Sequence, residues 1–325
     1  MNTTLPTNLN QQFVTSRGAD PEFFIKNKET GDIVSAIEVL KRDKYDPIIL
    51  GDDVSLYFDN AMGEFTVKPA FSRESFVESM RDAFTKIDKY IKSECGPEFE
   101  IVIQASHEFD EKYLNSEEAK KIGCNPEFSA DDIMQIVPPD FSGTLRSAGG
   151  HIAVGRDDFK GKEDNDDHVL MGFQSKIDLI KLLDYYVGVP FTLIDNDETS
   201  LRRRKIYGSP SSHRPKDFGA EYRVLSCLWT SSPTLVGLIY DLSELAVQTL
   251  IENKQDEIFN KVQKDLVNAC IKENNKELAD EIVQLIDLPK NLQVRLNQLK
   301  NVRSWDFYKE WNLKKSAAKK SVAAV

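Results

Sequence analysis

The sequence predicts an α+β protein in which antiparallel strands are interspersed with helices and the C-terminal quarter is helical. Two observations support this class. Short segments rich in β-branched and aromatic residues, separated by turn residues, fill most of the first two thirds of the chain without the regular alternation of a parallel sheet. From Thr234 to Leu313, stripes of leucine, isoleucine, valine and alanine are interleaved with lysines and glutamates, and this spacing favours helices.

Two hairpins are expected near the N-terminus. The first spans residues 22–37 and turns at residues 29–32. The second pairs residues 54–58 with residues 64–67 and is closed by Pro69. In both, β-branched and aromatic residues flank a turn that contains glycine, which is typical of paired antiparallel strands.

A helix is expected to follow the second hairpin, from an N-cap at Ser72 to about Lys92. Its apolar residues recur at intervals of three and four, as required of a helix that covers one face of a sheet: Phe76, Met80, Phe84, Ile87 and Ile91.

Later elements are less regular. Strands are expected over residues 98–106, over 145–154 with an interruption at a Gly-Gly pair, and over 221–229. An amphipathic helix is expected over residues 176–187. Near the C-terminus, an aromatic group is expected to dock on the body of the protein: Trp305, Phe307, Tyr308 and Trp311.

Composition restricts the function classes. With 42 Lys+Arg against 53 Asp+Glu, the net charge of -11 argues against a general nucleic-acid coat, because phosphate binding depends on Lys and Arg that displace counterions. No apolar run approaches the ~20 residues that span a bilayer, and the N-terminus lacks the features of a secretory signal. Four scattered cysteines without a CxxC pair fit reduced thiols. We therefore expect a cytoplasmic protein with no membrane partner.

Acidic residues and one histidine on the expected strands are candidates for a metal site. Asp20 and Glu22 stand at i and i+2, on one side of an extended chain. Glu64 opens a return strand, His151 follows two glycines that permit close approach, and Glu221 lies on a late strand. Carboxylates with one imidazole suit Mg²⁺ or Mn²⁺ in company with a phosphate. Each residue alone is also compatible with a solvated hairpin acid or a strand cap.

A basic cluster in this acidic chain strengthens the metal-phosphate interpretation. It lies just before the strand that carries Arg223 and comprises Arg202, Arg203, Arg204, Lys205, Arg214 and Lys216. Guanidinium groups offer planar, bidentate donors that fit phosphate oxygens. Metal-binding acids beside guanidinium groups are the combination that offsets the charge of an ATP triphosphate. The sequence has neither a P-loop nor a kinase-type glycine loop, which disfavours the commonest nucleotide folds.

Five segments carry a resemblance to a known family. They lie at residues 20–24, 64–70, 123–128, 145–152 and 202–226. The most specific are the Ala-Gly-Gly-His and Gly-x-Glu-Tyr-Arg pieces, which end at His151 and Arg223. In this order the segments resemble the phage carboxylate-amine ligase type 2 family, within the glutamine synthetase and glutamate-cysteine ligase superfamily of amidoligases. The resemblance spans roughly residues 17–230.

The resemblance implies a curved antiparallel sheet of the glutamine synthetase type, whose strands line a funnel entered by ATP at one end and by the acceptor at the other. It implies metal ligation by five residues: Asp20, Glu22, Glu64, His151 and Glu221. It implies contacts with the nucleotide phosphates or the acyl phosphate by a second set: Arg146, Arg202, Arg204, Arg214, Lys216 and Arg223. Of these residues, Arg214, Arg223 and Glu221 are the expected catalytic ones.

Two departures from the family pattern concern the site. Ala153 stands where the family often has a second histidine, so the donor pocket is expected to differ. Asp20 stands where the larger superfamily often has glutamate, a longer ligand. Neither change removes the metal site.

Four regions are expected: a flexible lead (1–16), a glutamine synthetase-like amidoligase core (17–232), a helical region packed on that core (233–313) and a disordered Lys-rich tail (314–325). The helical region lies outside the segments that carry the resemblance, and its role is left open.

The implied reaction is ATP-dependent amide or peptide bond formation through an acyl phosphate, with release of ADP, by a phage-encoded enzyme in the host cytoplasm. Two alternatives stay open: a kinase that stops at phosphoryl transfer, and a catalytically silent homologue that only binds. The sequence does not identify the small-molecule or peptide carboxylate and amine substrates. It also leaves open whether the chain forms a homo-oligomer and whether Ala153 reduces activity.

Overall fold

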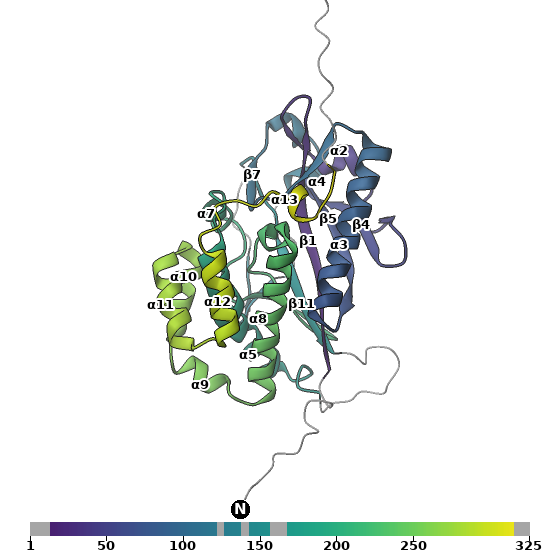
Figure 1. Cartoon of the computed structure of the whole chain (residues 1–325). Helices are drawn as coiled ribbons and strands as arrows, with labels where there is room; N and C mark the ends of the chain where they lie inside the picture. The colour runs from purple at the N-terminus through teal and green to yellow at the C-terminus, as the bar shows by residue number, and fades with distance from the viewer. Residues whose placement is uncertain (1–13, 122–126, 138–142, 157–167, 315–325) are drawn as a thin grey trace, which may run out of the picture.

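A computed structural model describes residues 14–121, 127–137, 143–156 and 168–314. Within these residues the main element is an 11-stranded sheet whose ladders are all antiparallel. In spatial order its main path is β3 (Ile48–Ile49), β4 (Val54–Asp59), β5 (Met62–Ala70), β1 (Thr15–Asn27), β11 (Gly150–Arg156), β13 (Gly219–Tyr222), β12 (Ser212–Lys216), β8 (Phe128–Ser129) and β9 (Met134–Gln135). Helices lie against this sheet, and the C-terminal region is helical (Figure 1). The predicted α+β class with a large antiparallel sheet is confirmed.

Strand β1 organises the sheet. It pairs with β5 on one side and β11 on the other, and its C-terminal end pairs with β2 (Ile33–Val34) and β6 (Phe99–Val102). Because side chains alternate along a strand, Ala19, Phe23 and Ile25 enter the main hydrophobic core, whereas Asp20 and Glu22 lie on the other face. The strand therefore separates an apolar face from a polar one.

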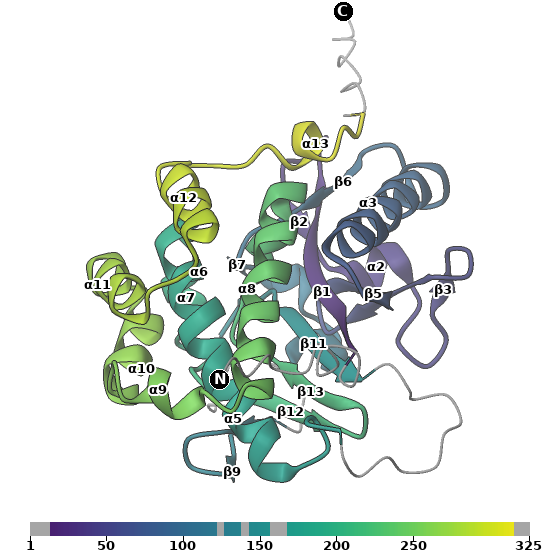
Figure 2. The same ribbon diagram turned by 60° about the horizontal axis from the view of Figure 1, so that its bottom comes forward.

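Three long helices cover the apolar face: α3 (Arg73–Tyr90), α5 (Phe173–Leu183) and α8 (Pro233–Ile251). Both α3 and α5 pack against α8, and α3 and α8 lie side by side over β1 (Figure 2). The buried guanidinium of Arg17 on β1 donates to Ser243 Oγ at 2.8 Å and pairs with Glu244 at 2.7 Å, both on α8. This polar contact fixes the helix layer to the strand.

Helix α8 is the one helix among the described residues that is long and apolar enough to cross a membrane. Within the fold, 67% of its apolar window is buried against the rest of the chain. The core helix of a soluble protein has the same properties, so this feature is weak evidence for a membrane span.

The early predictions are confirmed. Strands β1 and β2 flank the turn at residues 29–32, and β4 pairs with β5. Strand β5 continues through Pro69 to Ala70, one residue beyond the predicted close. Ser72 caps α3 by accepting a hydrogen bond from the Ser75 N–H at 3.1 Å, and a π-helical turn, η1 (Ile91–Cys95), extends the helix.

Two later strands are divided. The predicted strand over 98–106 is confirmed only in its first half: β6 ends at Val102, and β7 (Ser106–Glu108) pairs with β10 (Leu145–Ser147) in a separate sheet. The chain leaves β1 because the loop before α7 (Ser200–Arg203) takes its backbone donors: Asp197 accepts from Ala105 N at 2.5 Å and Thr199 Oγ1 from Ser106 N at 2.9 Å. The strand over 145–154 is interrupted at the Gly-Gly pair, as predicted, into β10 and β11.

The predicted strand over 221–229 is wrong. Strand β13 ends at Tyr222, and a 3₁₀ helix, η4 (Cys227–Ser231), follows. Between them the buried guanidinium of Arg203 donates to Val224 O at 2.9 Å and Leu225 O at 2.8 Å. These side-chain donors replace the strand partner that the carbonyls would otherwise need.

The helical prediction for the C-terminal region is confirmed. After α8 follow α9 (Gln255–Phe259), α10 (Lys264–Glu273), α11 (Lys276–Ile286), α12 (Lys290–Leu299) and α13 (Phe307–Glu310). The predicted helix over 176–187 corresponds to α5 and a π-helical segment, η3 (Asp184–Gly188). Of the expected aromatic group, Phe307 contacts Phe84 at 4.8 Å between ring centroids, and Trp311 Nε1 donates to Thr230 O at 2.8 Å.

The chain ends lie mostly outside the described residues. The predicted lead over 1–16 is described only from Val14, and β1 already begins at Thr15. Of the predicted tail, only Lys314 is described. Most of the segment at 123–128, which carries part of the resemblance, is likewise outside the description.

Candidate functional site

The candidate site lies on the polar face of the sheet, across β5, β1, β11 and β13. The antiparallel register places Asp20 opposite His151 and Glu22 opposite Glu64. Glu221 pairs with Ala153, which is two residues beyond His151 and therefore on the same face. The structure thus brings all five residues predicted as metal ligands to one face.

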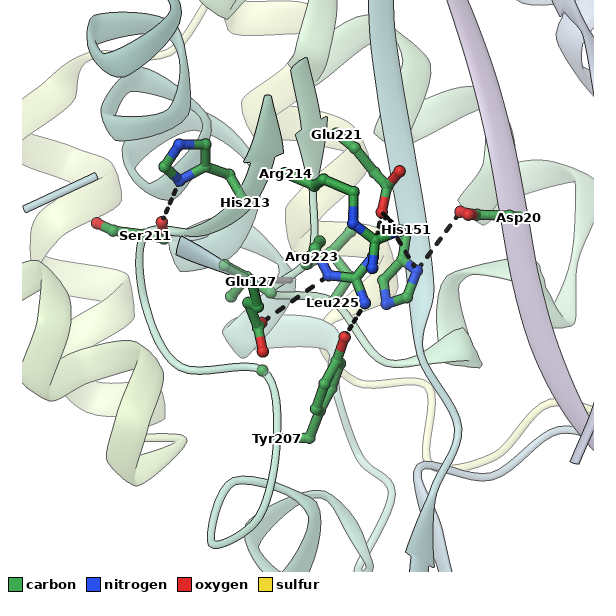
Figure 3. A network of polar contacts seen from close by, with 12 residues as sticks. Asp20, Glu127, His151, Tyr207, Ser211, His213, Arg214, Glu221, Arg223 and Leu225 are labelled. Carbon is green, nitrogen blue, oxygen red and sulfur yellow. Dashed lines mark hydrogen bonds and ion pairs between the residues drawn. The ribbon is translucent and has the colours of Figure 1, made fainter. Parts of the chain in front are cut away.

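The first group of ligand atoms comprises Asp20, His151 and Glu221, whose atoms lie within 4.8 Å of one another. His151 Nδ1 is 3.5 Å from Asp20 Oδ1 and 3.9 Å from Glu221 Oε1 (Figure 3). The imidazole is only 3% exposed, and neither ring nitrogen has a hydrogen-bond partner in the part of the chain that the structure describes. Buried polar atoms are rarely left unpaired, so this imidazole is arranged to bind a further ligand.

The second group comprises Glu22, Asp59 and Glu64, again with ligand atoms within 4.8 Å of one another. Tyr57 donates its hydroxyl hydrogen to Glu64 Oε1 at 2.9 Å. The backbone N–H of Gly149 donates to Glu22 Oε2 at 2.5 Å. These bonds fix two of the carboxylates while leaving each a further oxygen.

The electrostatics of these acidic groups suit a bound cation. Burial raises the pKa of Asp20 to about 6 and that of Glu22 to about 8. Burial and the neighbouring acids raise the pKa of Glu64 well above its usual value, while burial, then Arg223, lowers the pKa of His151 well below its own. Crowded carboxylates beside a neutral imidazole fit Mg²⁺ or Mn²⁺, which bind deprotonated oxygen and nitrogen ligands.

Three cations surround Glu221. Lys216 Nζ lies 2.7 Å from its Oε2, Arg214 Nη1 lies 3.5 Å from its Oε1, and Arg223 Nη1 pairs with the same Oε1. The buried Arg223 also donates to the hydroxyl of Tyr207 (Figure 3). Positive charge is therefore concentrated at one end of the acidic groups, where it can meet an anionic ligand.

The remaining predicted cations lie elsewhere or bind the backbone. Arg146 lines a small cavity with Glu22, but its guanidinium donates to the carbonyls of Ala119 and Gly143, both at 2.9 Å. Arg204 Nη1 donates to the carbonyls of Val224, at 2.7 Å, and Gly208. Arg202 is near Glu108, at 3.9 Å, away from both ligand groups. Their roles in phosphate binding stay predictions.

Sequence reasoning missed four residues at the site: Tyr57, Asp59, Glu127 and Tyr207. Arg203 belonged to the predicted basic cluster but had no predicted role at the site. Asp59 ends β4, in the connection between the two predicted strands of the second hairpin, and the tight turn to β5 brings it back toward Glu64. Glu127 lay in one of the family segments without an assigned role. Its Oε1 is 4.0 Å from Arg223 Nε (Figure 3).

Comparisons with known proteins give one family match, over a part of the chain that includes one of the five segments, residues 202–226, and the C-terminal helices. Residues 165–311 match the model of a family described as Phage phiEco32-like COOH.NH2 ligase-type 2. No curated protein matches the chain. Among solved structures, apo GmaS without ligand is 10% identical with a TM-score of 0.42, over 91% of this chain and 69% of that one. A bifunctional glutathione synthetase from Pasteurella multocida is 11% identical with a TM-score of 0.42, over 94% of this chain and 49% of that one, so this chain spans about half its length.

Proposed function

We propose that the protein is a carboxylate-amine ligase that forms an amide or peptide bond at the expense of ATP. The family match over residues 165–311 supports this proposal. The γ-phosphoryl group passes to a carboxylate oxygen, which releases ADP and leaves an acyl phosphate. The amine then attacks the acyl carbon, a C–N bond forms and phosphate departs. One observation carries the proposal: two buried groups of acidic ligands lie on one sheet face beside Arg214, Lys216 and Arg223.

The donor sets suit two divalent ions. Asp20, His151 and Glu221 would hold one, and Glu22, Asp59 and Glu64 would hold the other: both sets supply hard oxygen ligands, with one imidazole. Bound Mg²⁺ or Mn²⁺ supplies positive charge that offsets the triphosphate.

An anionic carboxylate and an anionic γ-phosphate repel each other, and cationic side chains of the protein would reduce this repulsion. Arg214 and Arg223 would donate hydrogen bonds to the phosphoryl group during its transfer, when negative charge is spread over its oxygens. Tyr207 accepts a hydrogen bond from Arg223 and so orients its guanidinium before substrate binds. Such preorganisation lowers the barrier because the donors need not reorganise during transfer.

The same proposal extends to origin and location. The family description motivates a phage-encoded enzyme acting in the host cytoplasm on small-molecule or peptide substrates. No observation on the described residues favours the kinase alternative, whose product would be a stable phosphorylated compound and no amide.

The decisive experiment measures ADP release from MgATP across amino acids and peptides, followed by mass measurement of the product. We expect ADP together with a product that has lost one water relative to its two substrates. Glu221→Gln should abolish ADP release, whereas Glu108→Gln, an exposed glutamate beside Arg202, should not. A phosphorylated product without an amide would replace the ligase with a kinase. Stabilisation by MgATP without turnover would indicate a silent homologue.

A further inference from the structure

Two cavities meet at Tyr207. The smaller, about 10 Å³, is also lined by Glu22 and Arg146, and has room for about one water molecule. The larger, about 200 Å³, is lined by Glu127 and by residues of the segment around Tyr207. Since a water molecule occupies about 30 Å³ of liquid, the larger cavity has room for a small organic molecule. Tyr207 lines both cavities, and Glu22 of the second ligand group lines the smaller one.

Glu127 is an incompletely paired carboxylate at the larger cavity. It is only 4% exposed, and its Oε1 has no hydrogen-bond partner among the described residues, although Ser212 lies beside the carboxyl group. Its nearest cation among the described residues is Arg223, whose Nε lies 4.0 Å away and whose Nη1 and Nη2 contact Glu221 and Tyr207. Burying a carboxylate with an unsatisfied oxygen is costly, so a ligand that donates a hydrogen bond or brings positive charge would be stabilised there.

The other lining residues define the rest of the ligand. Ile136, Val137 and Ile206 supply aliphatic surface, and Val137 is 81% exposed although apolar. Arg204 and Lys205 also line the cavity and bring positive charge. A buried acid, aliphatic surface and two basic residues complement an ammonium group, an aliphatic side chain and a carboxylate, which are the three parts of an α-amino acid.

We propose that this cavity binds the amine substrate, that this substrate is an α-amino acid with an aliphatic side chain, and that Glu127 receives its ammonium group. The inference rests on the proposed ligase function and names the class of its amine substrate. Arg223 contacts both Glu127 and Glu221. An amine bound at Glu127 would therefore be separated from the first ligand group by the guanidinium group of Arg223.

Glu127 is also placed to act as the base that deprotonates the amine substrate. An ammonium group has no lone pair, so it must lose a proton before it attacks. The Glu127 carboxylate takes that proton, and burial raises the pKa of Glu127, which favours the transfer. The neutral amine then attacks the acyl carbon, the C–N bond forms, the bond from carbon to the phosphate oxygen breaks, and the second amine proton leaves with the phosphate.

Calorimetric titration tests the inference without knowledge of the carboxylate substrate. The probes are L-valine, L-leucine and L-isoleucine, with isopentylamine and 4-methylpentanoate as leucine analogues that lack the carboxylate or the amine. We expect at least one amino acid to bind the wild-type chain, and both analogues to bind more weakly than leucine. Glu127→Gln should weaken amino-acid binding by at least about 10-fold, the effect of losing a hydrogen bond to a charged group.

The matched control is Asp132→Asn, an exposed acid between β8 and β9 that does not line the cavity; it should bind the amino acids like the wild type. Absence of binding by all three amino acids, or equal binding by Glu127→Gln, would overturn the inference. Stabilisation by MgATP is measured on the same samples. If MgATP stabilises the chain but amino acids fail to bind, the inference fails alone; if MgATP neither stabilises it nor yields ADP, the proposed function fails as well.

Discussion

Asp20 and His151 face each other across the β1–β11 ladder, with His151 Nδ1 3.5 Å from Asp20 Oδ1. Directly opposed residues on antiparallel strands project to the same face, so the register alone brings an oxygen and a nitrogen ligand together. Glu221 reaches the same point from β13. This group of three ligands therefore depends on the pairing of three strands and on no loop.

Removing the imidazole should remove one cation site. In His151→Asn, we expect the number of Mn²⁺ ions bound per chain to fall by one, or the affinity of one ion to fall by more than about 10-fold, because the first group loses its only nitrogen ligand. Equilibrium dialysis against Mn²⁺ measures both quantities. His107→Gln, on β7 and outside both groups, is the control. Unchanged Mn²⁺ binding by His151→Asn would exclude this group as a metal site.

Stability without metal should depend on pH through Glu22. Its pKa is about 8 in the folded chain, above the usual 4.5, so the folded state binds the extra proton. The resulting stabilisation is complete below pH 4.5 and is lost as the pH rises through 8. In EDTA we therefore expect a lower melting temperature at pH 8 than at pH 6. Glu22→Gln should reduce this difference.

Added Mg²⁺ should act in the opposite direction. A cation competes with protons for the carboxylates, so Mg²⁺ should raise the melting temperature more at pH 8 than at pH 6. Thermal unfolding at both pH values, with EDTA or Mg²⁺, tests this in four measurements. Greater stabilisation by Mg²⁺ at pH 6 would contradict the assignment of Glu22 as a ligand.

Substitutions of Arg223 should lower the stability of the fold and the rate of ADP release, and the two effects should be separable. Arg223→Met removes the buried guanidinium group that contacts both Glu221 and Glu127. Glu221 keeps Lys216 and Arg214, whereas the buried Glu127 loses its nearest cation, and we expect the free energy of unfolding to fall by about 3–5 kcal/mol. Arg223→Lys keeps the charge but loses the planar set of donors, so it should recover part of the stability without recovering ADP release. Urea unfolding and an ADP assay measure the two effects.

The control for Arg223 is Arg202→Met. Arg202 is partly exposed and its contact with Glu108 is weak, at 3.9 Å, so the free energy of unfolding should change by less than about 0.5 kcal/mol. Loss of ADP release in Arg202→Met would instead support the predicted role of Arg202 at the phosphates. Wild-type turnover by Arg223→Lys would rule out a need for the guanidinium group.

The sequence predicted the placement of the candidate metal ligands better than that of the candidate phosphate-binding cations. Asp20, Glu22 and His151 could be recognised because strand alternation and a glycine pair fix which way they face. Asp59 could not, because an acid before a tight turn is as common in a solvated loop as in a site. Its proximity to Glu64 follows from the register between β4 and β5, and the hydrophobic pattern of the sequence does not determine that register.

The arginine cluster shows the same limit. In α7, consecutive residues differ by about 100° around the helix axis, so Arg203 is buried against Val224 O while Arg202 turns outward. A run of three arginines contains no signal that distinguishes these directions. The division of residues 98–106 between two sheets was equally hidden, since it depends on Asp197 and Thr199, which lie about ninety residues away in sequence.

The glycine pair before His151 yields the last prediction. A methyl group on Gly150 would overlap Trp229 Nε1 and lie 2.6 Å from Ser226 O, while the indole N–H already donates to Gly150 O at 3.0 Å. Gly150→Ala must therefore displace either the buried indole or the start of β11, and we expect a loss of about 1–3 kcal/mol in the free energy of unfolding.

The same displacement should disturb the site, because His151 is the next residue on β11. We expect Gly150→Ala to weaken Mn²⁺ binding as well as lower stability. Gly18→Ala is the matched control: its methyl group would meet Ala153 Cβ at an ordinary 3.7 Å, so both properties should be retained. Urea unfolding and Mn²⁺ dialysis on the two variants decide the matter. If Gly150→Ala is destabilised yet binds Mn²⁺ like Gly18→Ala, the glycine serves packing against Trp229 and does not position the imidazole.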